Sequence, residues 1–592
     1  MTRLPPSRLG AEAGTLALLV LLLVGGCRAL GPGGPFEKEN AYVAAYRSVA
    51  QMQTRAERTD YRETSRYGDI VEFLLPLRML DEYRAQPSGF AGGEPFGPDP
   101  LPSDGWNLSV YDFGTSVEGR ALPVVIARGA GDRDSLRQSE KTRVLVFANI
   151  HAGEVAGKEA ALMLIRDLAQ GQHTEWADSL VVMIAPIYNA DGNERFAYSN
   201  RPRQWGPVGG MGQRPNAQGL DLNRDFMKLA SPEARGLVGF LNDADPHVIV
   251  DLHTTNGTHM GYHLTYAPPL SPNTPEAIDR HLRDEWLPAI SDEILRTDDM
   301  ATEHYGNTPG TFGPANGVPR GWYSFSAQPR FGTNYGGLRN RYAILSEAYS
   351  YASFEDRVTV TKRFVEEILH AVHRDASRVR AITEAADATS LVGDSLAVRA
   401  FFTAPNSTRE ILIGAVDTLA HPETGDPMFA RRDVRTPEAM PVFSRFGATE
   451  TERVPEAYLV PSRLGDVLDL LTAHGIRTEP QAEAVVDAQV FRVDSVRVAE
   501  RPFQNVRQRE AFGAWSRSAE SFVGPLEEEG YVRVPMDQPL ARVAFALLEP
   551  RSDDGVVNWG IVDLDTQPRA VYPILREPAR LGTPTETPRR TD

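Results

Sequence analysis

Cysteine is almost absent from this sequence, which contains a single one, Cys27, in 592 residues. One cysteine cannot form an internal disulfide, so the fold has to be stabilised by its hydrophobic core. Clustered basic residues are also lacking, because the formal net charge is -17 and both signs of charge are spread along the chain. This distribution argues against a nucleic-acid-binding protein, which needs a basic surface to contact phosphates.

Long apolar runs are scarce as well. Residues 14–24 (GTLALLVLLLV) form one, preceded by two arginines, and its length is typical of a signal peptide rather than a transmembrane helix. The run leads to V-G-G-C at Cys27, which resembles a bacterial lipobox, whose cysteine is lipidated; ordinary cleavage after Ala29 is the alternative. We therefore expect an exported bacterial protein, periplasmic or held at the outer membrane by an N-terminal lipid anchor.

The length of the chain predicts two or three domains. Composition divides it into a signal peptide (1–27), an N-terminal helical segment with a Gly/Pro-rich linker (28–104), a central domain (105–385), a C-terminal accessory region (386–580) and a polar, disordered tail (581–592). The accessory region contains a strand–helix pattern at 458–476 and β-like runs such as 490–498. We expect it to be α+β or rich in β-strands.

Short apolar runs alternate with amphipathic helices in the central domain. Runs at 121–127, 143–150, 179–186, 247–253 and 341–348 indicate buried strands, and the spacing over 154–169 predicts a helix. Strands that are apolar on both faces and alternate with helices indicate an α/β fold with a mostly parallel sheet covered on each side.

Metal-ligating residues lie where two of these strands end. His151 follows the strand at 143–150 and Glu154 is three residues further on, so that a tight turn can direct both side chains at one point. His253 closes the strand at 247–253. The carboxyl ends of parallel strands form the usual site of α/β folds, and a catalytic zinc takes three protein ligands of this kind. His370 and His373 share a helix face but lack a third ligand, and we interpret them as a surface pair.

Two further polar segments offer hydrolytic chemistry. Glu347, at the end of another apolar strand, is placed to act as a base towards water. The segment G-L-D-L-N-R-D-F (219–226) contains an arginine whose planar guanidinium can bind a carboxylate through two hydrogen bonds.

Together these segments resemble the zinc carboxypeptidases of the carboxypeptidase A type. The ordered motifs are H-A-G-E, G-L-D-L-N-R-D, D-L-H-T and S-E-A-Y, with T-S-V-E-G-R-A-L (115–122) and Y-N-A-D-G (188–192) between or before them. The resemblance covers roughly residues 60–375. It implies a mixed, eight-stranded sheet flanked by helices, one Zn²⁺ per chain and peptide substrates with a free C-terminus.

The resemblance also implies a role for individual residues. His151, Glu154 and His253 would hold the zinc, and Glu347 would be the general base. Asn223 and Arg224 would bind the terminal carboxylate of the substrate, while Asp221 would orient the first histidine. These roles describe an exopeptidase.

Two positions stay open within the resemblance. Arg203 is expected to stabilise the oxyanion, with Arg201 as the alternative. Tyr323 is expected to be the family's mobile tyrosine, with Tyr335 as the alternative.

Two other functions are compatible with the motifs. D-L-H-T and D-L-N-R also resemble aspartoacylase and succinylglutamate desuccinylase, which cleave N-acyl amino acids with the same metal ligands. A non-catalytic surface-binding protein on the same fold is the second alternative. Chain length, the E-G-R segment and the export signal favour the peptidase.

Overall fold

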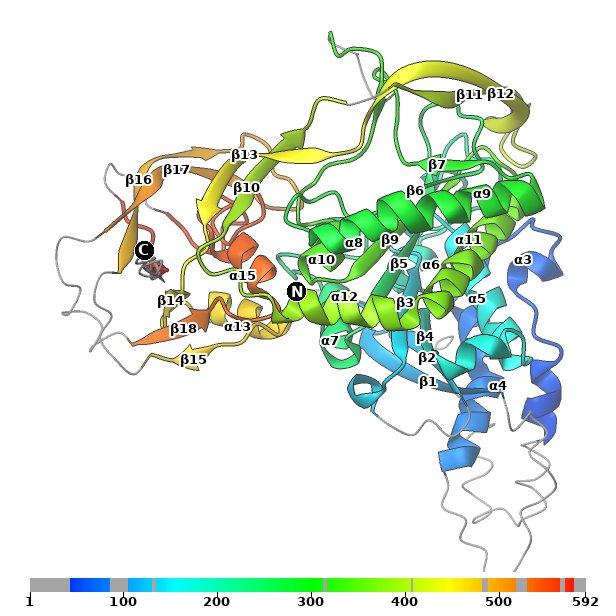
Figure 1. Ribbon diagram of the computed structural model, residues 1–592. Helices are drawn as coiled ribbons and strands as arrows, with labels where there is room; N and C mark the ends of the chain where they lie inside the picture. Colours follow the sequence, from blue (N-terminus) through cyan, green and yellow to red (C-terminus); the bar gives the residue numbers. More distant parts are fainter. Residues whose placement is uncertain are drawn as a thin grey trace, which may run out of the picture.

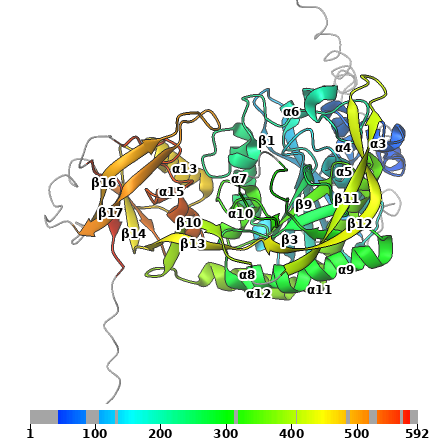
Figure 2. The same ribbon diagram turned by 90° about the horizontal axis from the view of Figure 1, so that it is seen from above.

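The computed structural model describes residues 43–85, 105–129, 135–311, 317–405, 408–481, 488–517, 530–564 and 570–579. These residues form a large α/β domain, a long β-ribbon and a C-terminal β-rich domain (Figure 1). The C-terminal domain lies beside the α/β domain in both ribbon views (Figure 2). The expected signal peptide with Cys27 and the tail 581–592 lie outside the described residues.

A mixed sheet of eight strands forms the centre of the α/β domain, in the order β1-β2-β4-β3-β5-β9-β6-β7. Strands β4, β3, β5 and β9 run parallel to one another, whereas β1, β2 and β6 join by antiparallel pairing. The strands are β1 (Trp106–Thr115), β2 (Ala121–Gly129), β3 (Thr142–Ala148), β4 (Leu180–Ala185), β5 (Val248–Thr255), β6 (Leu264–Ala267), β7 (Thr302–His304) and β9 (Tyr342–Tyr349). The expected α/β fold with a mixed, mostly parallel eight-stranded sheet is confirmed.

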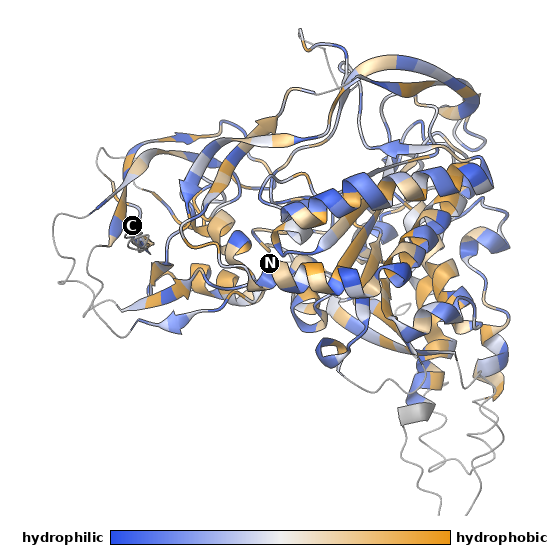
Figure 3. Cartoon of the chain, viewed as in Figure 1, coloured by the Kyte–Doolittle hydropathy of each residue, from blue (hydrophilic) through white to orange (hydrophobic). Residues whose placement is uncertain are grey.

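The central strands are apolar because each of their faces is covered by a separate core. Along β3, Val144 and Val146 belong to one hydrophobic cluster, while Leu145 and Phe147 belong to the other. Successive side chains of a strand point to opposite faces, so a continuous apolar run is what a doubly covered strand requires. Figure 3 shows the strands of the sheet coloured as hydrophobic and the outward sides of the covering helices as largely hydrophilic.

Helices cover both faces of the sheet. The first core includes side chains from α4 (Tyr67–Ala85), α5 (Ala156–Ala169), α8 (Glu276–Arg280), η5 (His281–Trp286), α9 (Leu287–Asp298), α11 (Phe354–Arg374) and α12 (Ala376–Ala388). The second core includes side chains from α7 (Pro232–Ala244) and α10 (Gly332–Leu338). The remaining short helices are α3 (Arg55–Arg58), η1 (Leu136–Gln138), η2 (Thr174–Asp178), α6 (Ala190–Glu194), η3 (Tyr198–Asn200) and η4 (Leu222–Arg224).

The N-terminal segment is bound to α5 through buried polar groups. The Glu159 carboxylate accepts hydrogen bonds from the Thr64 hydroxyl (2.8 Å) and the Ser65 backbone N–H (2.6 Å). Lys158 donates to the carbonyl of Ser65 at 2.5 Å. Buried charges are tolerated when they are hydrogen-bonded in this way, so residues 64–65 are fixed against the helix that follows the H-A-G-E turn.

The β-ribbon consists of β11 (Thr408–Ala420) and β12 (Pro427–Phe443), and β12 also pairs in parallel with β8 (Trp322–Tyr323). A two-stranded sheet of β10 (Ser395–Phe402) and β13 (Phe446–Arg453) lies between the ribbon and the C-terminal domain (Figure 1). Gly414 lets the ribbon approach the α/β domain, because a Cβ there would lie 2.2 Å from the carbonyl oxygen of Met260.

The described part of the C-terminal domain is a six-stranded antiparallel sheet with the helices α13 and α15, as the β-rich composition predicted. Its strands follow the order β15-β18-β14-β19-β16-β17. The elements are β14 (Ala457–Pro461), α13 (Gly465–His474), β15 (Glu479–Pro480), β16 (Gln489–Val498), β17 (Arg509–Arg517), β18 (Tyr531–Pro535), α15 (Ala541–Leu548) and β19 (Leu575–Glu577).

Buried polar contacts connect the C-terminal domain to the α/β domain. Arg330 forms an ion pair with Asp554 at 2.7 Å, and both side chains are almost completely buried. Tyr335 in α10 donates its hydroxyl hydrogen to Nδ1 of His474 in α13 (2.8 Å). The second hydrophobic core continues through this boundary, so the two domains share one interior.

Within the described residues, the structure has no helix that is both long enough and apolar enough to span a membrane.

The interdomain histidine predicts a pH dependence of stability. Burial lowers the pKa of His474 to about 3, whereas an unfolded histidine titrates near 6.5. The unfolded state therefore binds the additional proton first, and stability falls as the pH falls from 6.5 towards 3. We expect His474→Gln to reduce the slope of unfolding free energy against pH by about 1.4 kcal/mol per pH unit between pH 6 and 4. Urea denaturation of the wild type and of His474→Gln at several pH values measures this slope. Equal slopes for the two proteins would contradict a lowered pKa of His474.

Candidate metal centre and substrate pocket

His151 and Glu154 lie in the turn between β3 and α5, at the carboxyl end of a central parallel strand. The backbone N–H of Glu154 donates to the carbonyl of His151 (2.8 Å) and closes the turn. Position 153 requires glycine, since a Cβ there would lie 2.7 Å from the carbonyl oxygen of Gly212 and 2.9 Å from Cγ of Arg201. The small residues of H-A-G-E therefore allow another loop to pass directly behind the turn.

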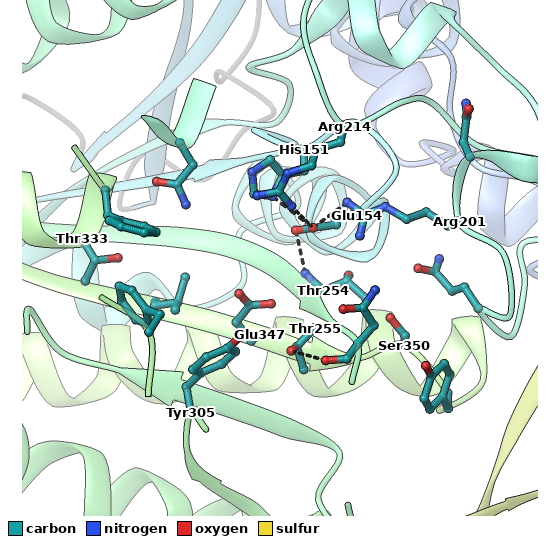
Figure 4. A pocket seen from close by; sticks show the side chains of 18 of the residues that line it. His151, Glu154, Arg201, Arg214, Thr254, Thr255, Tyr305, Thr333, Glu347 and Ser350 are labelled. Carbon is teal, nitrogen blue, oxygen red and sulfur yellow. Dashed lines mark hydrogen bonds and ion pairs between the residues drawn. The ribbon is translucent and has the colours of Figure 1, made fainter. Parts of the chain in front are cut away.

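Three side chains bring their donor atoms to one point. Nδ1 of His151 lies 3.0 Å from Oε1 of Glu154, and Nδ1 of His253 lies 2.9 Å from Oε2 of the same carboxylate. The two Nδ1 atoms are 3.2 Å apart. All three residues are buried, and Figure 4 shows His151 and Glu154 directed towards each other. The structure thus brings together the three ligands expected from the sequence.

Each histidine is held from behind by a carboxylate. Nε2 of His151 lies 2.9 Å from Oδ1 of Asp221, as expected, and Nε2 of His253 lies 2.9 Å from Oδ2 of Asp251. Asp251 was not predicted, although Asp251 and His253 are two residues apart on one strand and therefore share a face. A carboxylate that accepts the Nε2 proton leaves the lone pair on Nδ1, which raises the basicity of a metal-binding imidazole.

This donor set fits zinc. Because Nε2 of His151 bonds to Asp221 and Nε2 of His253 faces Asp251, the two Nδ1 lone pairs and the Glu154 carboxylate face each other, and a divalent cation neutralises their mutual repulsion. Two imidazole nitrogens and one carboxylate oxygen are the ligands of a catalytic zinc that keeps one position open. His151, Glu154 and His253 are therefore the residues that would hold it.

Glu347 lies on β9, directly opposite His253 on β5 in the parallel register. Burial raises the pKa of the Glu347 carboxyl to about 8, and the nearby Glu154 contributes to the increase. A cation at the ligands favours the ionised carboxylate and opposes this shift. The side chain lines the same cavity as His151 and Glu154, so it can reach a water molecule or substrate held beside the metal site (Figure 4).

The N-R pair of the motif G-L-D-L-N-R forms another wall of the cavity. Oδ1 of Asn223 accepts from the Gly332 backbone N–H (2.9 Å), which fixes the amide. The guanidinium of Arg224 lies over the ring of Phe331, 4.0 Å from its centroid. Asn223 and Arg224 both line the cavity, where they can bind an anionic group.

The arginine next to the metal ligands is not the one expected. Arg203 has a left-handed backbone (φ 73°) and places its guanidinium 5.2 Å from the ring of Phe429 in the β-ribbon, outside the cavity. Arg201, the alternative, lines the cavity and pairs with Glu154 at 2.6 Å. Arg214, which the sequence analysis missed, also lines it, 3.6 Å from Oε1 of Glu154 and 2.8 Å from Oδ2 of Asp221. The sequence feature that could have pointed to Arg214 is its position seven residues before Asp221.

Neither candidate tyrosine lies in the cavity. Tyr323 stacks on Phe443 of the ribbon (4.2 Å between ring centroids) and donates to the carbonyl of Pro319. Tyr335 is fully buried against His474. Tyr305 and Tyr351 line the cavity instead. The structure therefore does not bring Tyr323 to the cavity, because the β8–β12 pairing holds it at the ribbon.

The cavity has a volume of about 400 Å³ and a lining of mixed character. Its arginines are Arg201, Arg214 and Arg224, and its acidic residues are the ligand Glu154 and Glu347. Uncharged side chains form much of the remainder: Thr254, Thr255, Tyr305, Phe325, Phe331, Thr333 and Leu345.

The loop that carries Asp221 also contacts the C-terminal domain. The side-chain oxygen of Gln504 accepts a hydrogen bond from the backbone N–H of Asp221 (2.8 Å). Gln504 thus reaches the residue that orients His151. This contact joins positions 283 residues apart, and no local pattern predicts it.

Comparison with known sequences identifies relatives. The profile of the family described as zinc carboxypeptidase matches residues 106–247. Carboxypeptidase 2 of Trichophyton rubrum is 23% identical over 508 residues, which cover 80% of this chain and 84% of that protein. Carboxypeptidase E of Caenorhabditis elegans is 34% identical over 131 residues, 21% of this chain and 26% of that protein.

Solved structures give weaker similarities. Carboxypeptidase A from Helicoverpa armigera has a TM-score of 0.37 at 15% identity, covering 58% of this chain and 81% of that chain. A metallo-carboxypeptidase from Burkholderia cenocepacia has a TM-score of 0.33 at 19% identity, covering 47% of this chain and 66% of that chain. The family match ends at residue 247, before His253 and Glu347. These two residues lie side by side because β5 and β9 pair in parallel.

The unpredicted carboxylate gives a test of the metal centre. We expect Asp251→Asn to weaken zinc binding by about 10-fold or more, because the amide lacks the charge that favours a basic Nδ1 on His253. Competition with a chromophoric chelator measures the affinity. Asp243→Asn, at an exposed position of α7, is the control and leaves the affinity unchanged. Equal affinities for the two variants would exclude an orienting role for Asp251.

Proposed function

We propose that the protein is a zinc-dependent hydrolase that removes the C-terminal residue from peptides, since residues 106–247 match the zinc carboxypeptidase family. The observation that carries the proposal is the common cavity of His151, Glu154, Glu347 and Arg224. It combines a metal site, a base and a cation for a carboxylate, which are the three requirements of an exopeptidase of this kind.

The metal ligands are His151, Glu154 and His253, with one zinc ion at this centre. When bound there, zinc supplies a Lewis acid that polarises a carbonyl oxygen and lowers the pKa of water. Asp221 and Asp251 keep the imidazole nitrogens directed at the ion.

Glu347 is the proposed general base. Its carboxylate takes a proton from the attacking water and then transfers that proton to the leaving amine, so the residue ends the cycle in its initial state. Support comes from its position beside His253 in the sheet and from its place in the lining of the cavity that His151 and Glu154 also line.

Arg214 is the proposed donor to the developing oxyanion. Its guanidinium approaches both Glu154 and Asp221, so it is held at the edge of the metal site by charge-assisted hydrogen bonds. A fixed donor in this position stabilises negative charge without needing to reorganise during the reaction. Arg201 forms the neighbouring wall of the cavity.

Asn223 and Arg224 are the proposed binding site for the terminal carboxylate. The uncharged residues of the lining, which include Tyr305, Phe331 and Leu345, are suited to a neutral C-terminal side chain. A lysine or arginine side chain would lack an acidic partner there, since the acidic residues of the lining are the metal ligand and the base.

We further propose that the protein is exported as a bacterial lipoprotein through Cys27. The apolar run at 14–24 and the V-G-G-C sequence support this location. Such an enzyme would meet its peptides outside the cytoplasm.

Paired substrates test the function directly. Peptides with a free C-terminus should be shortened by one residue, most rapidly when that residue is neutral, and their C-terminal amides should be resistant, as read by mass spectrometry. Glu347→Gln should retain zinc but lose about 10²–10⁴-fold in kcat, because the amide cannot accept the proton.

Each alternative has its own outcome in this experiment. Hydrolysis of N-acyl amino acids in place of peptides would show that the protein is a deacylase. A folded protein without zinc or hydrolysis would identify a binding protein. Equal cleavage of free and amidated peptides would exclude an exopeptidase.

The arginine assignment is tested by a pair of variants. Arg214→Ala should lower kcat by about 10²–10³-fold with little change in zinc affinity, because the lost donor acts on the transition state. Arg203→Ala should stay close to the wild-type rate, since that side chain faces the ribbon. If steady-state kinetics showed a large loss of kcat for Arg203→Ala and a small one for Arg214→Ala, Arg203 would be the oxyanion donor, as the sequence predicts.

A further inference from the structure

A second cluster of histidine and carboxylate side chains lies on the surface, where η2 meets α11. His173 and Glu175 come from the turn that leads into β4, and His370 comes from the last turns of the helix after β9. The sequence pattern pairs His370 with His373, but His373 bonds instead to the hydroxyl of Ser179. His370 therefore groups with His173 and Glu175 and not with its helix neighbour His373.

The donor atoms of this cluster surround one point. Oε1 of Glu175 lies 3.8 Å from Nδ1 of His173 and 3.9 Å from Nε2 of His370. One atom from each of the three residues lies within 4.8 Å of the others. Donors around a tetrahedral zinc ion are about 3.3 Å apart at bond lengths near 2.0 Å. Rotation of the exposed Glu175 side chain can shorten the two distances that involve its carboxylate.

The outer nitrogens of both rings face carboxylates, as they do in the buried metal centre. Nε2 of His173 lies 3.3 Å from Oε1 of Glu366, and Nδ1 of His370 lies 3.7 Å from Oε1 of Glu367. A carboxylate at one ring nitrogen favours the proton there and leaves the lone pair on the other. In both rings that other nitrogen is the one that faces Glu175.

Aromatic packing fixes the rings. The imidazole of His173 stacks on the indole of Trp176 at 4.1 Å and 6° between planes, and the ring of His370 meets the same indole edge-on at 5.0 Å. Trp176 is fully buried, so it is a rigid support. His173 adopts a left-handed backbone conformation (φ 57°), which is uncommon for a residue with a Cβ.

Nearby basic groups leave the inner donors available. Lys362 pairs with Glu366 at 2.5 Å and Arg363 pairs with Glu367 at 2.6 Å, so the outer carboxylates are balanced by their own cations. Within the described part of the chain, Glu175 pairs with the two imidazoles. The cluster therefore presents two imidazoles and one carboxylate to a cation.

From this geometry we propose a second metal site, at which His173, Glu175 and His370 bind a divalent transition metal of the zinc class. Two imidazole nitrogens and one carboxylate favour such an ion over calcium or magnesium, which prefer oxygen ligands. The site joins the turn before β4 to α11 and so stabilises the folded chain when the metal is present. Its ligands are more exposed than those of the buried centre, so it binds zinc more weakly.

Metal stoichiometry of the zinc-loaded enzyme tests the proposal. Equilibrium dialysis against increasing free Zn²⁺, with elemental analysis, should show a second equivalent that binds after the first. The Tm should rise with free zinc over the same range. His370→Ala and Glu175→Gln should each lower the affinity of the second equivalent by about 10–100-fold while the first equivalent is retained.

His373→Ala is the matched control, one helical turn from His370 on α11, and should keep both equivalents. Wild-type protein that binds only one equivalent, or equal loss of the second equivalent in His370→Ala and His373→Ala, would overturn the proposal. Because the readouts are bound zinc and Tm rather than hydrolysis, the result is independent of whether the buried centre cleaves peptides.

Discussion

The parallel register of β3, β5 and β9 is the constraint on which the site depends. It places the carboxyl ends of three strands side by side, and each end contributes a group that has no function alone. His151 follows the first strand, His253 lies on the second and Glu347 lies opposite it on the third. Burial then makes these groups interdependent, because buried histidines and carboxylates are stable only when each has a partner.

The C-terminal domain belongs to the same arrangement. Its hydrophobic residues continue the second core of the sheet, and Arg330 and Asp554 form a buried ion pair across the boundary. Removing one member of such a pair leaves an uncompensated charge, so the two domains depend on each other for stability. Gln504 extends this dependence to the metal site through the backbone of Asp221. The C-terminal domain thus contacts the residue that faces His151.

The sequence predicts those parts of the structure that depend on local pattern. Apolar runs identify the central strands, and polar residues at the ends of these runs identify His151, His253 and Glu347. Local pattern does not place Arg203 and Tyr323, because both lie in segments whose course is set by the distant β-ribbon: Arg203 contacts Phe429 and Tyr323 stacks on Phe443. Sequence spacing within a loop gives the reach of a side chain but not its direction. Arg214 and Asp251 could have been found, since each lies close in sequence to an identified residue.

The two histidine–carboxylate clusters contain the same types of donor atom but lie in different surroundings. In both, an outer carboxylate faces one nitrogen of each imidazole and the other nitrogen faces a shared carboxylate. The buried cluster opens onto a cavity lined by Glu347 and three arginines, where an ion could contact a bound molecule. The surface cluster lies against a buried tryptophan and joins a turn to a helix. An ion in that position would hold the turn and the helix together, and its effect would therefore be on the stability of the fold.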